Sequence, residues 1–274
     1  MARALRHPFP QIRDYRPHIP LYAPQRYFDA FPEESIILPK VLENDLDDLS
    51  SSGRRWAIEP VSAGSHATVV KHRQWKAAVA AYLACMSFVD AQIGRLLDEL
   101  EKSPHANNTA IVLFADHGWH LGEKLHWRKF TLWEEATHNV LMMKAPGVTT
   151  AGGRCDRTVS LMDVFPTLTD LCGLPAKKEC EGVSLRALLA NPKAKWDRPA
   201  LTTFGKENHA VRSERWRYIR YSDGTEELYD RSQDPLEWKN LAGDPKLAPV
   251  KAEHGKWLPK VNAAEIPSRG NGEG

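Results

Sequence analysis

The sequence predicts an α/β fold that ends in a small antiparallel sheet, and three observations lead to this prediction. Residues 75–100 show the period of an amphipathic helix and are followed by an entirely apolar run at residues 110–115. A second apolar run at residues 140–143 repeats the strand signal, so helix and strand patterns alternate as in layered α/β domains. After about residue 198 the chain changes to short strands joined by tight turns.

The helix over residues 75–100 is the strongest periodic signal. Its apolar residues are spaced by four and three positions alternately, which places them on one face: Trp75, Val79, Tyr82, Met86, Val89, Ile93, Leu96 and Leu100. Ser103-Pro104 is predicted to end it. Because the following run, Ala110 to Ala115, is apolar throughout, we predict a central strand of a parallel sheet that is covered on both faces.

Local signals also place the later elements. Asp163 is predicted to cap a helix that carries Phe165 and Leu168 on its apolar side and is closed by Gly173. Asp223-Gly224 is a strong hairpin turn. The strands predicted around this turn lie at residues 210–212, 216–221 and 227–229.

Segments without a period are predicted to be irregular. Residues 1–34 are rich in Pro and Arg and form a loop, while the polar residues 42–65 form an exposed excursion. The predicted division of the chain is an α/β part at residues 1–197, an antiparallel sub-domain at 198–262 and a flexible tail at 263–274.

The composition is that of a globular protein and does not indicate a nucleic-acid or membrane partner. The formal net charge is +2 and the charges are interleaved, so we expect no nucleic-acid partner. No apolar run approaches the roughly 20 residues of a membrane span, so no membrane partner is expected either. Met1 to Pro8 lacks the apolar stretch of a secretory signal. Cys172 and Cys180 either pair, if the protein is exported, or remain free thiols.

Two residues that can bind a metal follow the predicted strand. Asp116 and His117 come directly after the apolar run and precede Gly118 and Trp119. In open α/β sheets ligands bind outside the carboxyl ends of strands, and a carboxylate with an imidazole can hold a divalent cation. The alternative is local: Asp116 caps the turn and His117 is a hydrogen-bonded loop histidine.

Two further segments carry candidate polar groups. A loop at residues 121–129 gathers Lys124, His126, Arg128 and Lys129, which either present positive charge to an anion beside the cation or form a solvated basic loop. His18 stands between two prolines, in a backbone rigid enough to hold an imidazole for proton transfer, unless it is an inert loop residue. His138 is not included in the predicted site because such histidines are more often packed.

Four segments together resemble the sulfatase family, and most closely its branch of iduronate-2-sulfatase and related bacterial enzymes. They lie in the family's order at residues 15–28, 82–97, 114–130 and 227–241. The resemblance implies an alkaline-phosphatase-like α/β sandwich, of which this chain holds the C-terminal portion without the N-terminal strands.

The resemblance also implies roles for individual residues. Asp116 and His117 would be ligands of a divalent cation, usually Ca²⁺ with Mg²⁺ as the alternative. Lys129 would contact the sulfate, and His18 would bind the sulfate and assist proton transfer at the leaving oxygen. Trp119 would line the substrate pocket. Asp163 is then a cap and not a metal ligand.

One hallmark of the family has no counterpart in this sequence. Sulfatases use a formylglycine made from the Cys or Ser of a Cys/Ser-x-Pro/Ala-x-Arg signature. No cysteine here has Arg four residues later, and Ser50, Ser51 and Ser213 have that Arg but lack the Pro or Ala. The resemblance therefore implies a truncated or split form, in which residues before Tyr15 replace the expected sequence and a separately encoded N-terminal half supplies the nucleophile.

The expected function is hydrolysis of sulfate esters, with a sulfated carbohydrate as substrate. Three alternatives remain: a phosphatase or phosphonate hydrolase of the same superfamily, a non-catalytic fragment that needs the N-terminal half, and a metal-independent binding module. Proteins of this family are usually exported to the periplasm, the extracellular space or the lysosome, although this chain carries no export signal.

Overall fold

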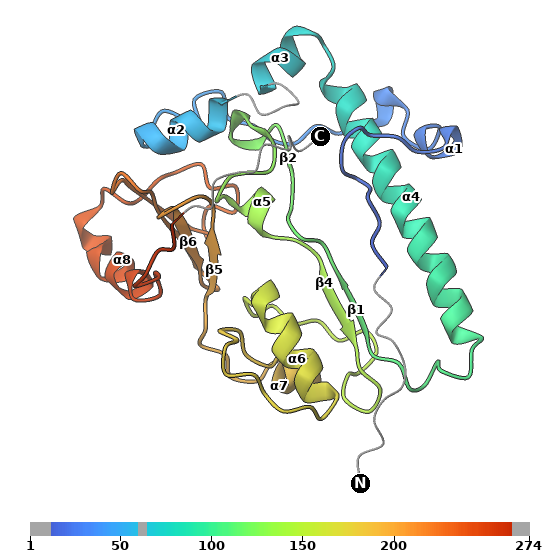
Figure 1. The fold of residues 1–274 in the computed structure, drawn as a ribbon. Coiled ribbons are helices and arrows are strands. Elements are labelled where there is room, and N and C mark those ends of the chain that lie inside the picture. The colour runs from blue at the N-terminus through green and yellow to red at the C-terminus, as the bar shows by residue number, and fades with distance from the viewer. Residues whose placement is uncertain (1–11, 60–64, 265–274) are drawn as a thin grey trace. The chain divides into compact units, whose positions relative to one another are not determined.

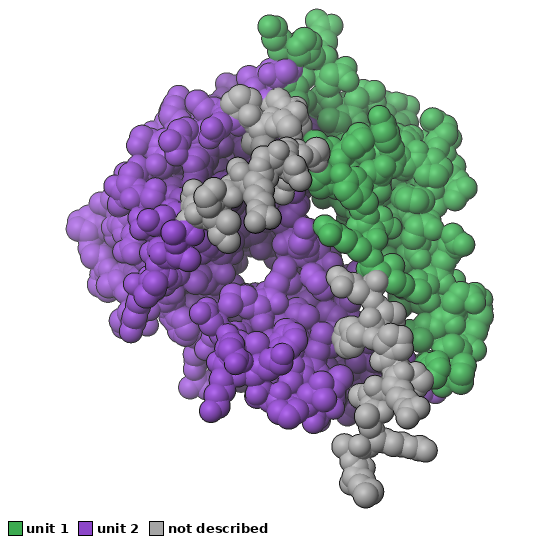
Figure 2. Space-filling model, in the orientation of Figure 1, with its two compact units in different colours: residues 1–38, 69–106 green, residues 39–68, 107–274 purple. Residues whose placement is uncertain are grey.

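The chain forms two compact units in the computed structural model, which describes residues 12–59 and 65–264 (Figure 2). Unit 1 comprises residues 1–38 and 69–106, and unit 2 comprises residues 39–68 and 107–274. The predicted replacement of sequence before Tyr15 falls largely on residues 1–11, and most of the predicted tail falls on residues 265–274. Both ranges lie outside the described residues.

Unit 1 is built on one long helix. The predicted helix is confirmed as α4, Trp75–Glu101, which ends just before Ser103-Pro104 (Figure 1). Two short elements, α1 (Gln25–Phe28) and η1 (Glu33–Ser35), pack on α4, and the Tyr27 and Phe88 rings meet edge to face at 5.4 Å. Helix α3, His66–Lys71, contains the boundary at which the chain passes from unit 2 to unit 1.

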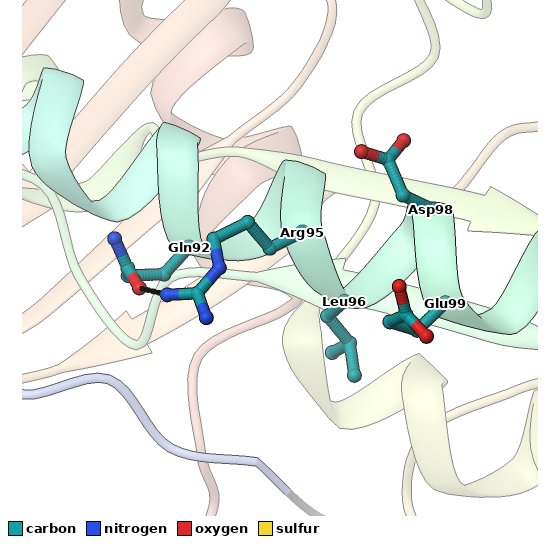
Figure 3. A pocket seen from close by; sticks show the side chains of 5 residues that line it. All are labelled: Gln92, Arg95, Leu96, Asp98 and Glu99. Carbon is teal, nitrogen blue, oxygen red and sulfur yellow. Dashed lines mark hydrogen bonds between the residues drawn. The ribbon is translucent and has the colours of Figure 1, made fainter.

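The composition of α4 departs from the expectation that no segment resembles a membrane span. Over an 18-residue window its mean hydropathy is 1.4 and 22% of the window is buried, so by length and composition it is the one helix among the described residues that could cross a membrane. Residues 77–86 are all apolar, and the many alanines of this run contribute to the value, although the run is shorter than a membrane span. Gln92, Arg95, Leu96, Asp98 and Glu99 of this helix line an open hollow (Figure 3).

The predicted central strand is present but its surroundings differ from the prediction. Strand β1, Ile111–Phe114, pairs antiparallel with β4, Leu141–Lys144, and the described residues provide it with no other strand. Phe114 and Met142 are 46% and 59% exposed. The expectation of a parallel, fully covered strand is therefore wrong for the described residues, because an apolar run does not specify which strand it pairs with.

The predicted C-terminal sheet is confirmed. It is an antiparallel meander of β5 (Ala200–Thr203), β6 (His209–Arg212), β7 (Trp216–Arg220) and β8 (Glu226–Asp230). Asp223-Gly224 forms the predicted hairpin, with Gly224 at φ +83°.

Both faces of this sheet are covered. Leu247, Val250 and Leu258, from and around η4 (Pro245–Leu247) and α8 (Ala248–Gly255), pack on the face that holds Val211 and Tyr218. The other face packs against a second cluster, which includes Leu46, Ala57, Leu132 and Trp133. The sheet is therefore an integral part of the core of unit 2.

The polar stretch at residues 42–65 is not the exposed excursion that its composition predicts. It contains α2, Ser51–Ile58, whose N-cap Ser50 accepts a hydrogen bond from the Gly53 amide at 3.0 Å. Leu46 and Ala57 are 5% and 2% exposed and belong to the core. The serines that suggest a low-complexity loop are in fact a helix start. Residues 60–64 of this stretch lie outside the described part.

The helix near Asp163 is present as α6, Val164–Leu171, beside α7, Arg186–Ala190. Its cap differs from the prediction. Ser160 caps a preceding 3₁₀ turn, η3 (Leu161–Asp163), and Asp163 accepts hydrogen bonds from the Ser160 and Val183 amides, both at 2.9 Å. Asp163 is thus the second residue of a capping box, and both of its carboxylate oxygens accept backbone hydrogen bonds. Cys172 and Cys180 are free thiols.

Candidate functional site

The turn at Asp116-His117-Gly118 directly follows β1 and is pressed against a short helix, α5 (Glu134–Thr137). The Gly118 amide donates to the Ala136 carbonyl at 2.8 Å. A Cβ atom on Gly118 would lie 2.0 Å from the Glu135 carbonyl oxygen. Only glycine allows this close backbone approach, so Gly118 fixes where the two preceding side chains begin.

Asp116 and His117 face each other in a way that suits a shared cation. The Nδ1 atom of His117 lies 2.7 Å from the Gly118 carbonyl oxygen, which can only accept, so in the neutral ring Nδ1 carries the hydrogen and Nε2 keeps its lone pair. This Nε2 atom lies 3.7 Å from Oδ1 of Asp116. Two ligands at right angles around a Ca²⁺ ion lie about 3.3–3.7 Å apart, given bond lengths near 2.3–2.6 Å.

The turn fits a divalent cation as part of a site. It offers one carboxylate, whose side chain is 75% exposed, and one imidazole. Ca²⁺ takes about six to eight ligands. Within residues 12–59 and 65–264, no group of three or more His, Cys, Asp or Glu side chains is arranged to hold a metal ion. The two residues can therefore hold a cation only together with further ligands.

A two-stranded ribbon brings Lys129 toward this turn. Strand β2 (His120–Leu121) pairs antiparallel with β3 (Trp127–Arg128), with His120 opposite Arg128. Continued by one residue, this register sets Trp119 beside Lys129 at the end of the ribbon nearest His117. Lys129 is half-buried and its Nζ lies 5.1 Å from the centre of the Phe130 ring.

Lys124 and His126 both point inward. Neither of the two predicted interpretations, a loop that presents charge to an anion or a solvated basic loop, describes them. The Lys124 side chain is 1% exposed, and its Nζ donates to Asp45 Oδ1 at 2.7 Å and to the Glu237 carbonyl. His126 is buried between the carbonyls of Ala57 and Lys129, at 2.9 and 3.0 Å, and burial lowers its pKa. These two residues hold the loop in place.

His120 is a structural residue that the sequence did not single out. It is fully buried, with ring nitrogens 3.1 Å from the Glu123 carbonyl and 2.8 Å from the Thr131 hydroxyl, and burial sets its pKa well below the usual value. Four non-glycine residues of this loop, which includes η2 (Glu123–Leu125), have positive φ: Lys124, Leu125, Arg128 and Phe130. Such strained backbone clusters at functional sites.

Helix α5, which supports the turn, carries two glutamates with opposite electrostatics. Burial would raise the pKa of Glu134, but Arg217, Arg212 and Arg231 outweigh it and lower the pKa to about 2. Burial, reinforced by the charge of Glu237, raises the pKa of Glu135 to about 7. The sequence does not predict this network, because Arg212 and Arg217 lie 78 and 83 residues after Glu134, and Arg231 lies further still.

His18 belongs to unit 1, whereas Asp116, His117, Trp119 and Lys129 all belong to unit 2. Its Nδ1 atom lies 2.7 Å from the Ile19 carbonyl oxygen and its ring lies 4.7 Å from the Tyr15 ring. Arg16 donates to the carbonyls of Tyr22 and His18 at 2.7 and 3.3 Å. The imidazole is thus oriented by contacts within its own unit.

Comparison with solved structures shows the fold class of this chain. The crystal structure of a phosphonate monoester hydrolase of Agrobacterium radiobacter superposes with a TM-score of 0.76 over 88% of this chain and 54% of that one, at 23% identity. At this identity the likeness shows the fold alone. The fold is of the alkaline-phosphatase-like α/β class.

The sequence comparisons then give the family. A sulfatase family model matches residues 15–174, and a model described as N-sulphoglucosamine sulphohydrolase, C-terminal, matches residues 122–264. The chain is 42% identical to a sulfatase of Formosa agariphila over 90% of its own length and 48% of the relative's. It is 31% identical to a delta-4,5-hexuronate-2-O-sulfatase of Bacteroides thetaiotaomicron, over 64% of this chain and 39% of that one. The chain belongs to the sulfatase family, and it spans about half the length of the curated relatives it matches or less.

Proposed function

We propose that this chain supplies part of the active site of a sulfate-ester hydrolase. Asp116 and His117 hold a divalent cation, and Lys129 and Trp119 contact the sulfate group of the substrate. The observation that supports this most is the 3.7 Å separation between Asp116 Oδ1 and His117 Nε2, both in a turn after β1. The ribbon that carries Lys129 to the same end adds a positive charge for an anionic substrate.

Each side chain has a distinct task in this proposal. The Lys129 ammonium donates hydrogen bonds to sulfate oxygens and offsets their negative charge. For His18, whose Nδ1 atom lies 2.7 Å from the Ile19 carbonyl oxygen, the family resemblance supports a role in binding the sulfate and in proton transfer to the leaving oxygen. Trp119 forms an apolar wall beside the anion. The bound cation, Ca²⁺ or alternatively Mg²⁺, supplies further positive charge at the sulfate.

This proposal takes the nucleophile from outside the residues of this sequence. No Cys or Ser here stands in the signature from which formylglycine is made. We propose that a separately encoded N-terminal half, or a preceding segment, supplies the formylglycine and the remaining cation ligands. The two ligands of the Asp116 turn are too few for Ca²⁺ by themselves, which agrees with a divided site.

The names of the relatives support a proposal for the substrate class. One matched relative acts, by its name, on a 2-O-sulfated hexuronate, which supports a sulfated carbohydrate as the substrate of this site. The likeness to a phosphonate monoester hydrolase concerns the fold alone and does not favour phosphorus chemistry.

The test is an aryl-sulfate hydrolysis assay on the purified chain, with and without a co-expressed N-terminal sulfatase half that carries the signature. We expect turnover only with the added half, and its loss in Lys129→Gln. Lys239→Gln, an exposed lysine of the same unit, is the matched control. Faster turnover of an aryl phosphonate than of the aryl sulfate would contradict the proposed chemistry, and turnover by the chain alone would contradict the divided site.

A further inference from the structure

Three planar groups follow one another next to the proposed cation site. The guanidinium carbon of Arg128 lies 5.7 Å from the centre of the Trp119 ring. The Trp119 ring in turn lies 6.5 Å from the His117 ring, with only 27° between the two planes. A chain of stacked groups thus leads from a buried arginine to the imidazole that faces Asp116.

The far end of this stack is firmly anchored. Arg128 is 4% exposed and sits in β3 opposite His120, which is hydrogen-bonded through both ring nitrogens. The backbone of Arg128 has φ +80°, an unfavourable conformation that persists only where its surroundings enforce it. The backbone from which the Arg128 side chain extends is therefore held in place.

The His117 ring, at the other end of the stack, is held less firmly. The His117 ring is tied through Nδ1 to the carbonyl of the next residue, a contact that still allows the ring to tilt. Trp119, between Gly118 and β2, can limit that tilt because its indole lies almost parallel to the imidazole.

We propose that Arg128 is a positioning residue for the cation-binding turn: its guanidinium orients Trp119, and Trp119 orients the His117 ring toward Asp116. This inference rests on the proposed function of that turn. Arginine suits the task because its guanidinium is planar and weakly hydrated and stacks on indole faces, whereas a lysine ammonium is a compact, strongly hydrated charge. At 4% exposure, Arg128 is placed to support the pocket and not to meet a substrate.

The first experiment reads the His117 ring directly, without any metal. Long-range ¹H–¹⁵N spectra of the labelled full chain report which nitrogen of each histidine carries the hydrogen, and His117→Ala assigns the signal. We expect one Nδ1–H form in the wild-type chain and a mixture of both forms in Arg128→Gln and in Arg128→Lys. Trp119→Leu should give the same mixture without touching the buried arginine, which covers the case in which the Arg128 variants do not fold.

The matched control is Arg198→Gln. The Arg198 guanidinium lies 5.6 Å from the centre of the Trp257 ring in the same unit, so this variant also removes an arginine stacked on a tryptophan. It should leave the His117 signal unchanged. An unchanged His117 signal in Arg128→Gln and Trp119→Leu would overturn the proposal.

The second experiment measures Mn²⁺ binding by calorimetry on the chain with its co-expressed N-terminal half, in a double-mutant design. Loss of an outer partner of a metal ligand typically weakens metal affinity by about 10–100-fold, so we expect a weakening of at least about tenfold in Arg128→Gln. In a His117→Ala background the same substitution should cause no further loss. Equal losses in both backgrounds would show that Arg128 acts through general structure and would overturn the proposal.

The two experiments separate the two claims. If His117→Ala does not change Mn²⁺ binding, the proposed function of the turn is wrong. The histidine spectra then still decide whether Arg128 orients the His117 ring.

Discussion

Asp116 Oδ1 and His117 Nε2 lie 3.7 Å apart, while His117 Nδ1 is held 2.7 Å from the Gly118 carbonyl oxygen. The main chain thus holds one end of the imidazole, and the other ring nitrogen, Nε2, faces a carboxylate. The same carboxylate oxygen accepts a hydrogen bond from the His117 amide at 3.1 Å, so local turn formation also holds Asp116 in place. The proposed cation role adds to this local one.

Removing the negative charge of the turn should weaken cation binding. Asp116→Asn keeps the size of the side chain but loses its charge, and Ca²⁺ affinity depends on the charge of its ligands. We expect Ca²⁺ affinity to fall on the order of tenfold, measured by calorimetry on the chain with its co-expressed half. Asp156→Asn, an exposed aspartate of the same unit, should have no effect. Equal affinities for Asp116→Asn and wild type would contradict the ligand role.

A methyl group at Gly118 should destabilise the turn. A Cβ atom there would lie 2.0 Å from a backbone oxygen, that of Glu135, so the main chain of α5 has to move. We expect Gly118→Ala to lower the free energy of unfolding by about 1–3 kcal/mol in urea titrations. Gly243→Ala, where no neighbouring atom comes within 4 Å of the added Cβ, should change it by less than about 0.5 kcal/mol. Similar effects of both substitutions would show that the close contact is not decisive.

The parts of the fold that the sequence predicted well are those with local signals. Helix α4 was predictable because its apolar residues repeat over 27 residues, and the hairpin at Gly224 because its turn residues are specific. The partner of β1 was not predictable, since a short apolar run is compatible with either a parallel or an antiparallel neighbour. Ser50 was misjudged because capping serines and loop serines look alike in a sequence.

In the candidate site, too, features with a local sequence signal were predictable and long-range contacts were not. Asp116 and His117 are adjacent in the chain, so the sequence could propose them as a pair. Lys124 looked like a surface cation, yet it is buried against Asp45, 79 residues earlier, and Glu237, 113 residues later. The pairing of residues so far apart is a property of the folded core that composition does not show.

Lys124 should therefore matter for stability. Its ion pair with Asp45 is buried on both sides, at 1% exposure each, and burial raises the pKa of Asp45. Lys124→Met leaves this carboxylate without its partner, and we expect a loss of about 3–5 kcal/mol in the free energy of unfolding. The double variant Asp45→Asn/Lys124→Met should recover part of that loss. Further destabilisation in the double variant would show that the buried charge is not the cause.

Neighbouring glutamates on α5 should give stability opposite dependences on pH. Both have an ordinary pKa of 4.5, but in the folded chain that of Glu134 is about 2 and that of Glu135 about 7. Glu134 therefore contributes stability above pH 4.5, which is lost as the pH falls toward 2. Glu135 keeps its proton only in the folded chain between pH 4.5 and 7, so its contribution is present below pH 4.5 and is lost as the pH rises through 7.

This sign can be tested with Glu135→Gln, which mimics the protonated side chain at every pH. We expect the variant to be more stable than wild type at pH 8, on the order of 1–3 kcal/mol, and to match it near pH 4. Urea titrations at several pH values measure the difference. Glu253→Gln, on an exposed part of α8, is the matched control and should run parallel to wild type. A constant offset between Glu135→Gln and wild type across this range would mean that the Glu135 carboxyl does not titrate between pH 4.5 and 7, and that its burial beside Glu237 does not shift its pKa.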